Sequence, residues 1–140
     1  RAKTRGQGRP PLEVWLTHHH ADHVGGVARL AGRGLPVLAH PLTAARLGLA
    51  ARPVGEGDLL RGRWRALFTP GHAPGHLAFH DERTGALLAG DMVSTLSTIV
   101  IDPPEGDMAE YLRQLERLRA LGPRTLYPAH GPPAPNGPGK

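Results

Sequence analysis

Thr17-His18-His19-His20-Ala21-Asp22-His23 is the stretch from which the rest of this sequence can be interpreted. It places three imidazoles and a carboxylate at His18, His20, Asp22 and His23, with the spacing i, i+2, i+4, i+5. Neutral imidazole is the commonest metal-ligating side chain, and imidazole combined with carboxylate suits Zn, Fe, Mn or Ni better than Ca or Mg. A purification-tag remnant would not carry Asp22 and His23 at these places, so the stretch predicts a metal site.

The residues before this stretch explain how the histidines are presented. Leu12 to Thr17 is a short apolar run, partly β-branched and aromatic, which predicts a buried strand. The histidines then follow the carboxyl end of that strand, on a loop. Loops held by a rigid scaffold are where proteins commonly place functional residues.

Three further motifs follow in order along the chain: Thr69-Pro70-Gly71-His72, Gly90-Asp91 and Pro128-Ala129-His130-Gly131. Together with the histidine stretch they resemble the signature of the metallo-β-lactamase fold hydrolases, and the match spans roughly Leu12 to Pro133. The resemblance implies an α/β (α+β) fold, the αββα sandwich of that superfamily.

The resemblance also implies a dinuclear site. His18, His20 and His72 would hold the first metal ion, Asp22, His23 and His130 the second, and Asp91 would bridge the two. The implied cofactors are two divalent ions, Zn as the leading choice with Mn or Fe as alternatives. Two such ions activate a shared water and clamp the reacting oxygens. The expected function is a metal-dependent hydrolase in which a metal-bridging hydroxide attacks an ester, thioester or phosphodiester. Asp22 would orient the hydroxide, and Asp91 would fix the separation of the two metals.

The ligand identities narrow the reaction within the superfamily. Redox di-iron relatives usually carry a carboxylate where this chain has His20, and the β-lactamases typically lack the Asp22-His23 pair. Nothing like the Gly-Cys-Gly-Arg-Phe segment of glyoxalase II follows Asp91. The Tyr127–Pro132 segment is most similar to the group that includes a mitochondrial endoribonuclease. The candidate substrates are therefore a small-molecule ester or thioester, or single-stranded RNA. A third alternative is that the chain is a non-catalytic metal-binding fragment.

Composition limits the other possibilities. The 140 residues suffice for one domain with a real core, contain no cysteine, and carry a formal net charge of +5 that is scattered or placed in the N-terminal tail. No apolar run approaches the roughly 20 residues of a membrane span. We expect residues 1–11 to form a loop or the end of a preceding helix, 12–133 a partial metallo-β-lactamase-like domain, and 134–140 a linker toward an absent C-terminal region. We also expect a cytoplasmic location and no evident protein partner, with the oligomeric state left open.

Hydrophobic periodicity and turn residues predict the remaining elements. Strands are expected at 37–39, 58–60, 64–69, 77–81, 86–89 and 125–127, and helices at 24–30, 41–49 and 107–121. The last helix carries an apolar stripe that we expect to be core, namely Met108, Tyr111, Leu112, Leu115, Leu118 and Leu121. His19 and His76 are candidates for a contact with a metal ligand or with the substrate, whereas His40 and His80 are expected to be ordinary surface or loop residues.

Overall fold

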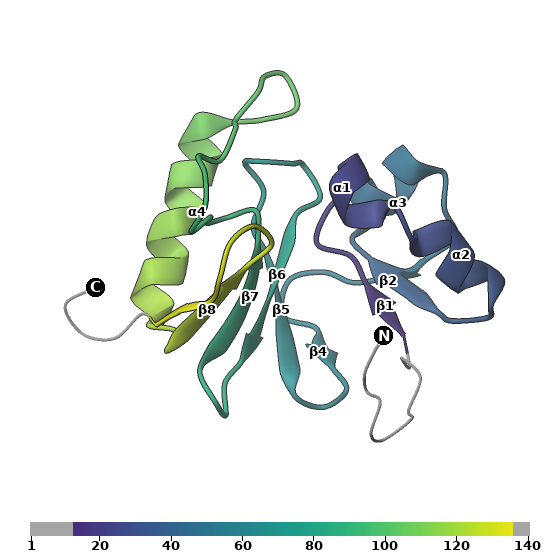
Figure 1. The fold of residues 1–140 in the computed structure, drawn as a ribbon, viewed down its shortest axis with the longest axis horizontal. Helices are drawn as coiled ribbons and strands as arrows, with labels where there is room; N and C mark the ends of the chain where they lie inside the picture. Colours follow the sequence, from purple (N-terminus) through teal and green to yellow (C-terminus); the bar gives the residue numbers. More distant parts are fainter. Residues whose placement is uncertain (1–12, 136–140) are drawn as a thin grey trace.

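The computed structural model describes residues 13–135, which form an αββα sandwich (Figure 1). The first sheet contains three parallel strands, β1 (Val14–Trp15), β2 (Val37–Ala39) and β3 (Arg52–Pro53). Three short helices, α1 (Ala21–Val24), α2 (Val27–Gly32) and α3 (Pro41–Leu47), belong to this half of the molecule. The fold class expected from the sequence is confirmed.

The second sheet has six strands in sequential order. They are β4 (Leu59–Leu60), β5 (Trp64–Phe68), β6 (Leu77–Asp81), β7 (Ala86–Gly90), β8 (Thr125–Pro128) and β9 (Ala134–Pro135). Neighbours are antiparallel except β7 and β8, which are parallel and are joined by a crossover containing α4 (Met108–Leu121). Two neighbouring parallel strands can be joined only by a long crossover connection. The amphipathic helix α4 lies in the crossover that the parallel pairing of β7 and β8 requires.

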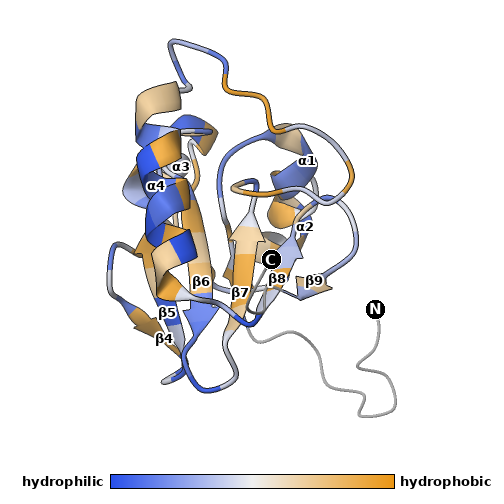
Figure 2. Cartoon of the chain, turned by 90° about the vertical axis from the view of Figure 1, so that its left-hand side faces the viewer, coloured by the Kyte–Doolittle hydropathy of each residue, from blue (hydrophilic) through white to orange (hydrophobic). Residues whose placement is uncertain are grey.

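Three apolar clusters separate the four layers. Between the two sheets, Leu38 packs with Leu77 and Phe79. Between the second sheet and α4, Leu118 packs with strand residues that include Leu87. The third cluster lies between the first sheet and its helices, and Figure 2 shows the apolar strands running between the helical layers. Successive side chains along a strand point to opposite faces of the sheet. The strands of the second sheet therefore contribute side chains to two apolar clusters, one on each face.

The segments that carry the four sequence motifs meet at one edge of the sandwich. β5, β7 and β8 all end at this edge, because β6 returns antiparallel between β5 and β7, and β8 runs parallel to β7. The loop after β1 reaches the same edge, where the backbone N–H of Leu77 donates to the carbonyl oxygen of Thr17. Segments far apart in the sequence thus end side by side (Figure 1).

Several expected boundaries differ from the structure. The strand expected to be buried over Leu12–Thr17 is the two-residue β1, whose side chains are half-buried. Instead of one helix over 24–30 there are two, α1 and α2, because Gly25 and Gly26 interrupt the regular helix between them. At the other end, the first two residues of the expected linker form β9, which pairs with β8. Residues 1–12 and 136–140, where the N-terminal loop and the rest of the linker were expected, lie outside the described part of the chain.

The burial of two groups of side chains also differs from expectation. Only part of the α4 stripe is core: Leu118 is buried, but Met108, Leu112 and Leu121 are largely exposed. His80 is not a surface residue, because it lies on the central strand β6 and is buried. Within residues 13–135, no helix is both long enough and apolar enough to cross a membrane.

Candidate metal centre

The first group of candidate ligands lies at the edge where the sequence motifs meet and is buried except for His20, which is half-buried. His18 and His20 lie between β1 and α1, His72 lies on the loop after β5, and Asp91 directly follows β7. Their ligand atoms all lie within 4.8 Å of one another. His18 is fully buried, and His72 and Asp91 nearly so. Four residues from three separate segments therefore lie close together, and all four are among the ligands that the family resemblance implied.

The second group lies beside the first and is more open to solvent. Asp22 and His23 are on α1, and His130 follows β8; these three also form a set with ligand atoms within 4.8 Å. The Asp22 side chain is 59% exposed and that of His130 is 39% exposed. The two groups thus form a buried half and an accessible half of one site.

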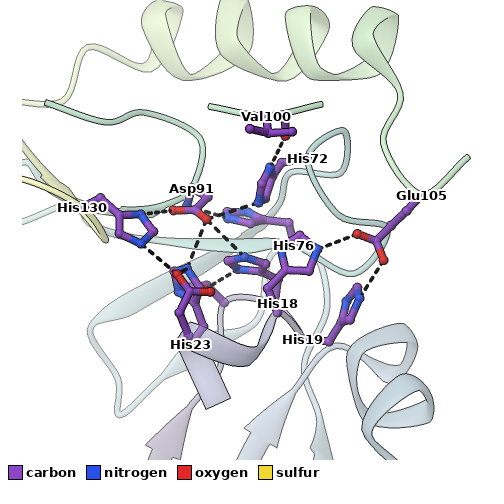
Figure 3. A network of polar contacts seen from close by, with 12 residues as sticks. His18, His19, His23, His72, His76, Asp91, Val100, Glu105 and His130 are labelled. Carbon is purple, nitrogen blue, oxygen red and sulfur yellow. Dashed lines mark hydrogen bonds and ion pairs between the residues drawn. The ribbon is translucent and has the colours of Figure 1, made fainter. Parts of the chain in front are cut away.

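Asp91 lies between the two groups (Figure 3). Its Oδ2 atom is 3.4 Å from His18 Nε2, 3.2 Å from His72 Nε2 and 3.1 Å from His23 Nε2, while Oδ1 is 3.0 Å from His130 Nδ1. The carboxylate therefore faces both groups at once, which is the position that a bridging ligand needs.

The imidazoles have free nitrogens where a metal ion would need them. His18 Nε2 and His72 Nε2 are buried and have no hydrogen-bond partner among the described residues. Buried polar atoms normally have a partner, so each such exception calls for an explanation. Ligand atoms around a tetrahedral zinc ion lie about 3.4 Å apart, given Zn–N and Zn–O bonds of about 2.0–2.1 Å. The 3.4 Å and 3.2 Å separations from Asp91 match this spacing, so the residues present fit a metal ion.

Electrostatics keep the carboxylates charged. Burial would raise the pKa of Asp91, but contacts with His18, His23 and His72 outweigh it and hold the pKa far below its usual range. Desolvation acts to raise the pKa of Asp22, but its contacts with His130 and His23 together outweigh this effect and lower the pKa. Burial lowers the pKa of His18 to about 4, so this imidazole is neutral near pH 7, the form that binds metals.

His76 supports the centre without belonging to either group. Its Nε2 accepts a hydrogen bond from the backbone N–H of Asp91 at 3.0 Å, and its Nδ1 lies 2.8 Å from Thr69 Oγ1. Since Nε2 accepts, Nδ1 carries the proton and donates to the threonine hydroxyl. The ring is fully buried, and burial holds its pKa well below the usual value. A neutral histidine therefore positions the backbone of Asp91, consistent with the contact near the metals expected from the sequence.

Glu105 is a site residue that the sequence did not reveal. It lies in the turn before α4, and its carboxylate contacts His19 Nε2 at 2.8 Å and His20 Nε2 at 2.5 Å. No motif or periodicity in the sequence singles out Glu105, and no spacing rule connects it to residues 19 and 20. His40, by contrast, caps the N-terminus of α3, where its side chain accepts a hydrogen bond from the Leu42 N–H.

Comparison with known proteins agrees with this geometry. A family model described as "Metallo-beta-lactamase superfamily" matches residues 1–130. A hydroxyacylglutathione hydrolase from Xylella fastidiosa is 38% identical over 128 residues, 88% of this chain and 47% of that protein. An atrochrysone carboxyl ACP thioesterase from Paecilomyces divaricatus is 36% identical over 130 residues, 91% of this chain and 40% of that protein. The chain thus spans less than half the length of these curated relatives.

Among solved structures, the protein TTHA1623 in a di-iron-bound form superimposes with a TM-score of 0.81 and 35% sequence identity. The match covers 94% of this chain and 79% of that one. The four motifs, the αββα layers and the paired histidine and aspartate groups are thus accompanied by similarity along nearly the whole chain. The chain belongs to the metallo-beta-lactamase superfamily.

Proposed function

We propose that the protein is a metal-dependent hydrolase with a dinuclear centre formed by His18, His20, Asp22, His23, His72, Asp91 and His130. The observation that carries this proposal is the position of Asp91, which faces both ligand groups while the buried nitrogens of His18 and His72 lack partners. Two bound divalent ions would supply Lewis acidity and lower the pKa of a water shared between them. Zinc suits the donor set, and iron is the alternative supported by the related di-iron structure.

The two ligand groups would have different roles, according to their exposure to solvent. The buried first group holds its ligands rigidly, whereas Asp22 and His130 border the open side from which a substrate approaches. Asp91 sets the spacing of the two groups. Asp22 contacts His130 and His23 through Oδ2, which leaves Oδ1 to accept a hydrogen bond from the attacking water and orient it.

We propose a thioester or related carboxylic ester as the substrate class. The support is that relatives at 36% and 38% identity are named as a thioesterase and as a hydroxyacylglutathione hydrolase. The segment after Asp91 differs from that of glyoxalase II, so we do not propose glutathione as the group recognised. The chemistry shared by these relatives is attack on an acyl carbonyl.

The first test is metal content, measured by plasma mass spectrometry on protein purified without added metal or a histidine tag. We expect about two equivalents of zinc or iron per chain. Asp91→Ala should lose paired binding and thioester hydrolysis while remaining folded, because it removes the one carboxylate that faces both groups. Asp58→Ala, which removes an exposed carboxylate in the loop just before β4, is the matched control. Unchanged turnover in Asp91→Ala would refute the proposal.

The endoribonuclease alternative rests on the Tyr127–Pro132 segment and makes a different prediction. Phosphate contacts release counterions, so cleavage of single-stranded RNA should fall steeply as salt rises. Hydrolysis of a small thioester should change little over the same range. Efficient, salt-sensitive RNA cleavage with no thioester turnover would favour the alternative over our proposal.

A further inference from the structure

Glu105 joins three segments that are distant in the sequence. One carboxylate oxygen lies 2.5 Å from His20 Nε2. The other contacts His19 Nε2 at 2.8 Å (Figure 3) and lies 3.2 Å from Arg46 Nη1 on α3. The glutamate side chain is 29% exposed, so these contacts are partly shielded from water. Nothing in the proposed reaction so far uses this carboxylate.

The other two histidines of the buried group show what such a contact does. His18 Nδ1 lies 2.9 Å from Thr17 Oγ1, and His72 Nδ1 donates to the Val100 carbonyl oxygen at 2.7 Å. In both rings one nitrogen is held by the protein and the opposite one, Nε2, is left unpartnered toward Asp91. Such an outer contact fixes the ring orientation and the tautomer of a metal-ligating histidine.

In His20, too, one ring nitrogen contacts another residue, but here it is Nε2 and not Nδ1. Because Nε2 is engaged by Glu105, Nδ1 is the nitrogen left to join His18, His72 and Asp91. We propose that Glu105 is a positioning residue that accepts a hydrogen bond from His20 Nε2–H and thereby orients Nδ1 as a metal ligand. This inference rests on the proposed function, because it requires a metal ion at the buried group.

The turn that carries Glu105 is built to hold it in place. The Gly106 N–H donates to the Asp102 carbonyl oxygen, and a Cβ at position 106 would lie 2.6 Å from the Asp102 nitrogen. The next residue, Asp107, donates its N–H to the Gly71 carbonyl oxygen at 2.7 Å, beside His72. The turn is thus attached to the loop that supplies another ligand. A ligand held by such a supporting contact is preorganised before the metal binds.

A second arrangement of the same atoms has to be distinguished. His19, His20 and Glu105 also have ligand atoms within 4.8 Å of one another and could hold a cation themselves. The Arg46 guanidinium already contacts the same carboxylate, and a positive charge there opposes a second cation. The geometry therefore favours Glu105 as a hydrogen-bond acceptor rather than a metal ligand.

The test compares the metal affinity of Glu105→Gln and Glu105→Ala with that of the unmodified protein, by zinc competition with a chromophoric chelator. Both variants should still bind two equivalents at saturation, but one equivalent should bind about 10- to 100-fold more weakly. The loss should be smaller for glutamine, whose amide oxygen can still accept from His20. Glu116→Ala removes an exposed glutamate of α4 and should leave both affinities unchanged. Unfolding of the metal-free proteins in urea checks that the fold is retained.

The other outcomes overturn the inference in distinguishable ways. Two equivalents bound to Glu105→Ala with unmodified affinity would overturn the positioning role and leave the proposed function standing. Three equivalents in the unmodified protein, with one lost in Glu105→Ala, would show that Glu105 is itself a ligand. An unmodified protein that binds no zinc, iron or manganese would overturn this inference and the proposed function together.

Discussion

At the scale of single residues, the site depends on which ring nitrogen of each histidine is hydrogen-bonded to the rest of the protein. Thr17, Val100 and Glu105 each hold one nitrogen of a different ring in the buried group. Because a neutral imidazole has one donor and one acceptor nitrogen, each such contact determines what the other nitrogen can do. A hydroxyl, a carbonyl and a carboxylate perform the same task, so the motif histidines alone do not specify the site.

Asp81 shows a purely structural use of a buried carboxylate. It lies at the end of β6 and accepts hydrogen bonds from Arg63 Nε at 2.7 Å, Thr84 Oγ1 at 2.7 Å and the Arg83 N–H at 3.1 Å. The bond from Arg63 is the main reason that the pKa of Asp81 lies well below its usual range. This network holds the β6–β7 turn closed on the side of the sheet away from the metal centre.

The lowered pKa makes a prediction about acid stability. A carboxylate with a depressed pKa in the folded state stabilises the fold above its unfolded pKa of about 3.9, and this contribution is lost as the pH falls toward the folded value. Asp81→Asn should therefore lower the urea midpoint at pH 7, and the gap to the unmodified protein should narrow below about pH 4. Asp58→Asn, at an exposed position, is the control. A gap that stays constant down to pH 2 would contradict the prediction.

At the scale of elements, the carboxyl end of β7 is tightly constrained. Gly90 has a φ of +56°, and a Cβ there would lie 2.6 Å from His76 Nε2. The same His76 atom accepts the hydrogen bond from Asp91. The strand can therefore present Asp91 to the metals only if its last residue has no side chain.

Two glycine substitutions separate backbone strain from crowding. Gly48, at the end of α3, has nearly the same φ of +61° but nothing within 4 Å of its Cβ position. Gly48→Ala should cost about 1–2 kcal/mol through the left-handed backbone alone. Gly90→Ala should cost more, because it adds the contact with His76, and should also weaken metal binding. Urea unfolding and zinc titration of both variants check this, and equal costs with equal metal affinity would contradict it.

At the scale of the whole molecule, the centre joins the two halves of the sandwich. His18, His20, Asp22 and His23 come from the half built on the first sheet, whereas His72, Asp91 and His130 come from the second sheet. The halves also meet through an apolar cluster, the backbone contact of Leu77 with Thr17, and side-chain contacts such as that of Glu105 with Arg46. Metal binding should therefore stabilise the association of the two sheets.

This predicts a strong dependence of thermal stability on metal. A ligand that binds only the folded state adds about 2.7 kcal/mol at a concentration 100 times its dissociation constant. Zinc should raise the melting temperature of the unmodified protein, and a chelator should lower it. Asp91→Ala should respond much less, because its two ligand groups are no longer connected. Equal shifts in both proteins, measured by differential scanning calorimetry, would show that zinc acts elsewhere.

Much of the fold follows from local sequence. β2 and β6 lie where the apolar runs 37–39 and 77–81 predicted them, and α4 begins after the Asp107 cap and ends at Gly122 with φ +70°. These elements are defined by side-chain periodicity and by capping residues, which are local properties. The two-residue strands β3 and β9 carry no such pattern and exist only through pairing with their neighbours.

For the site, the sequence by itself pointed to the chemistry of a metal centre. The four motifs resemble those of the metallo-β-lactamase superfamily, this resemblance implied the seven candidate ligands, and the structure brings all seven together in adjoining groups. Their role as ligands remains our proposal. The reason for this success is that metal ligation requires particular residue types, which are visible in a sequence.

Only the tertiary structure decided how these residues are supported. The contact of Glu105 with His20 spans 85 positions, and the contact of His76 with the Asp91 backbone depends on the β6–β7 pairing. Likewise, the exposure of Leu112 on α4 and the burial of His80 on β6 depend on which layers cover each face. Such contacts arise from the packing of distant segments, and no local periodicity or spacing encodes them.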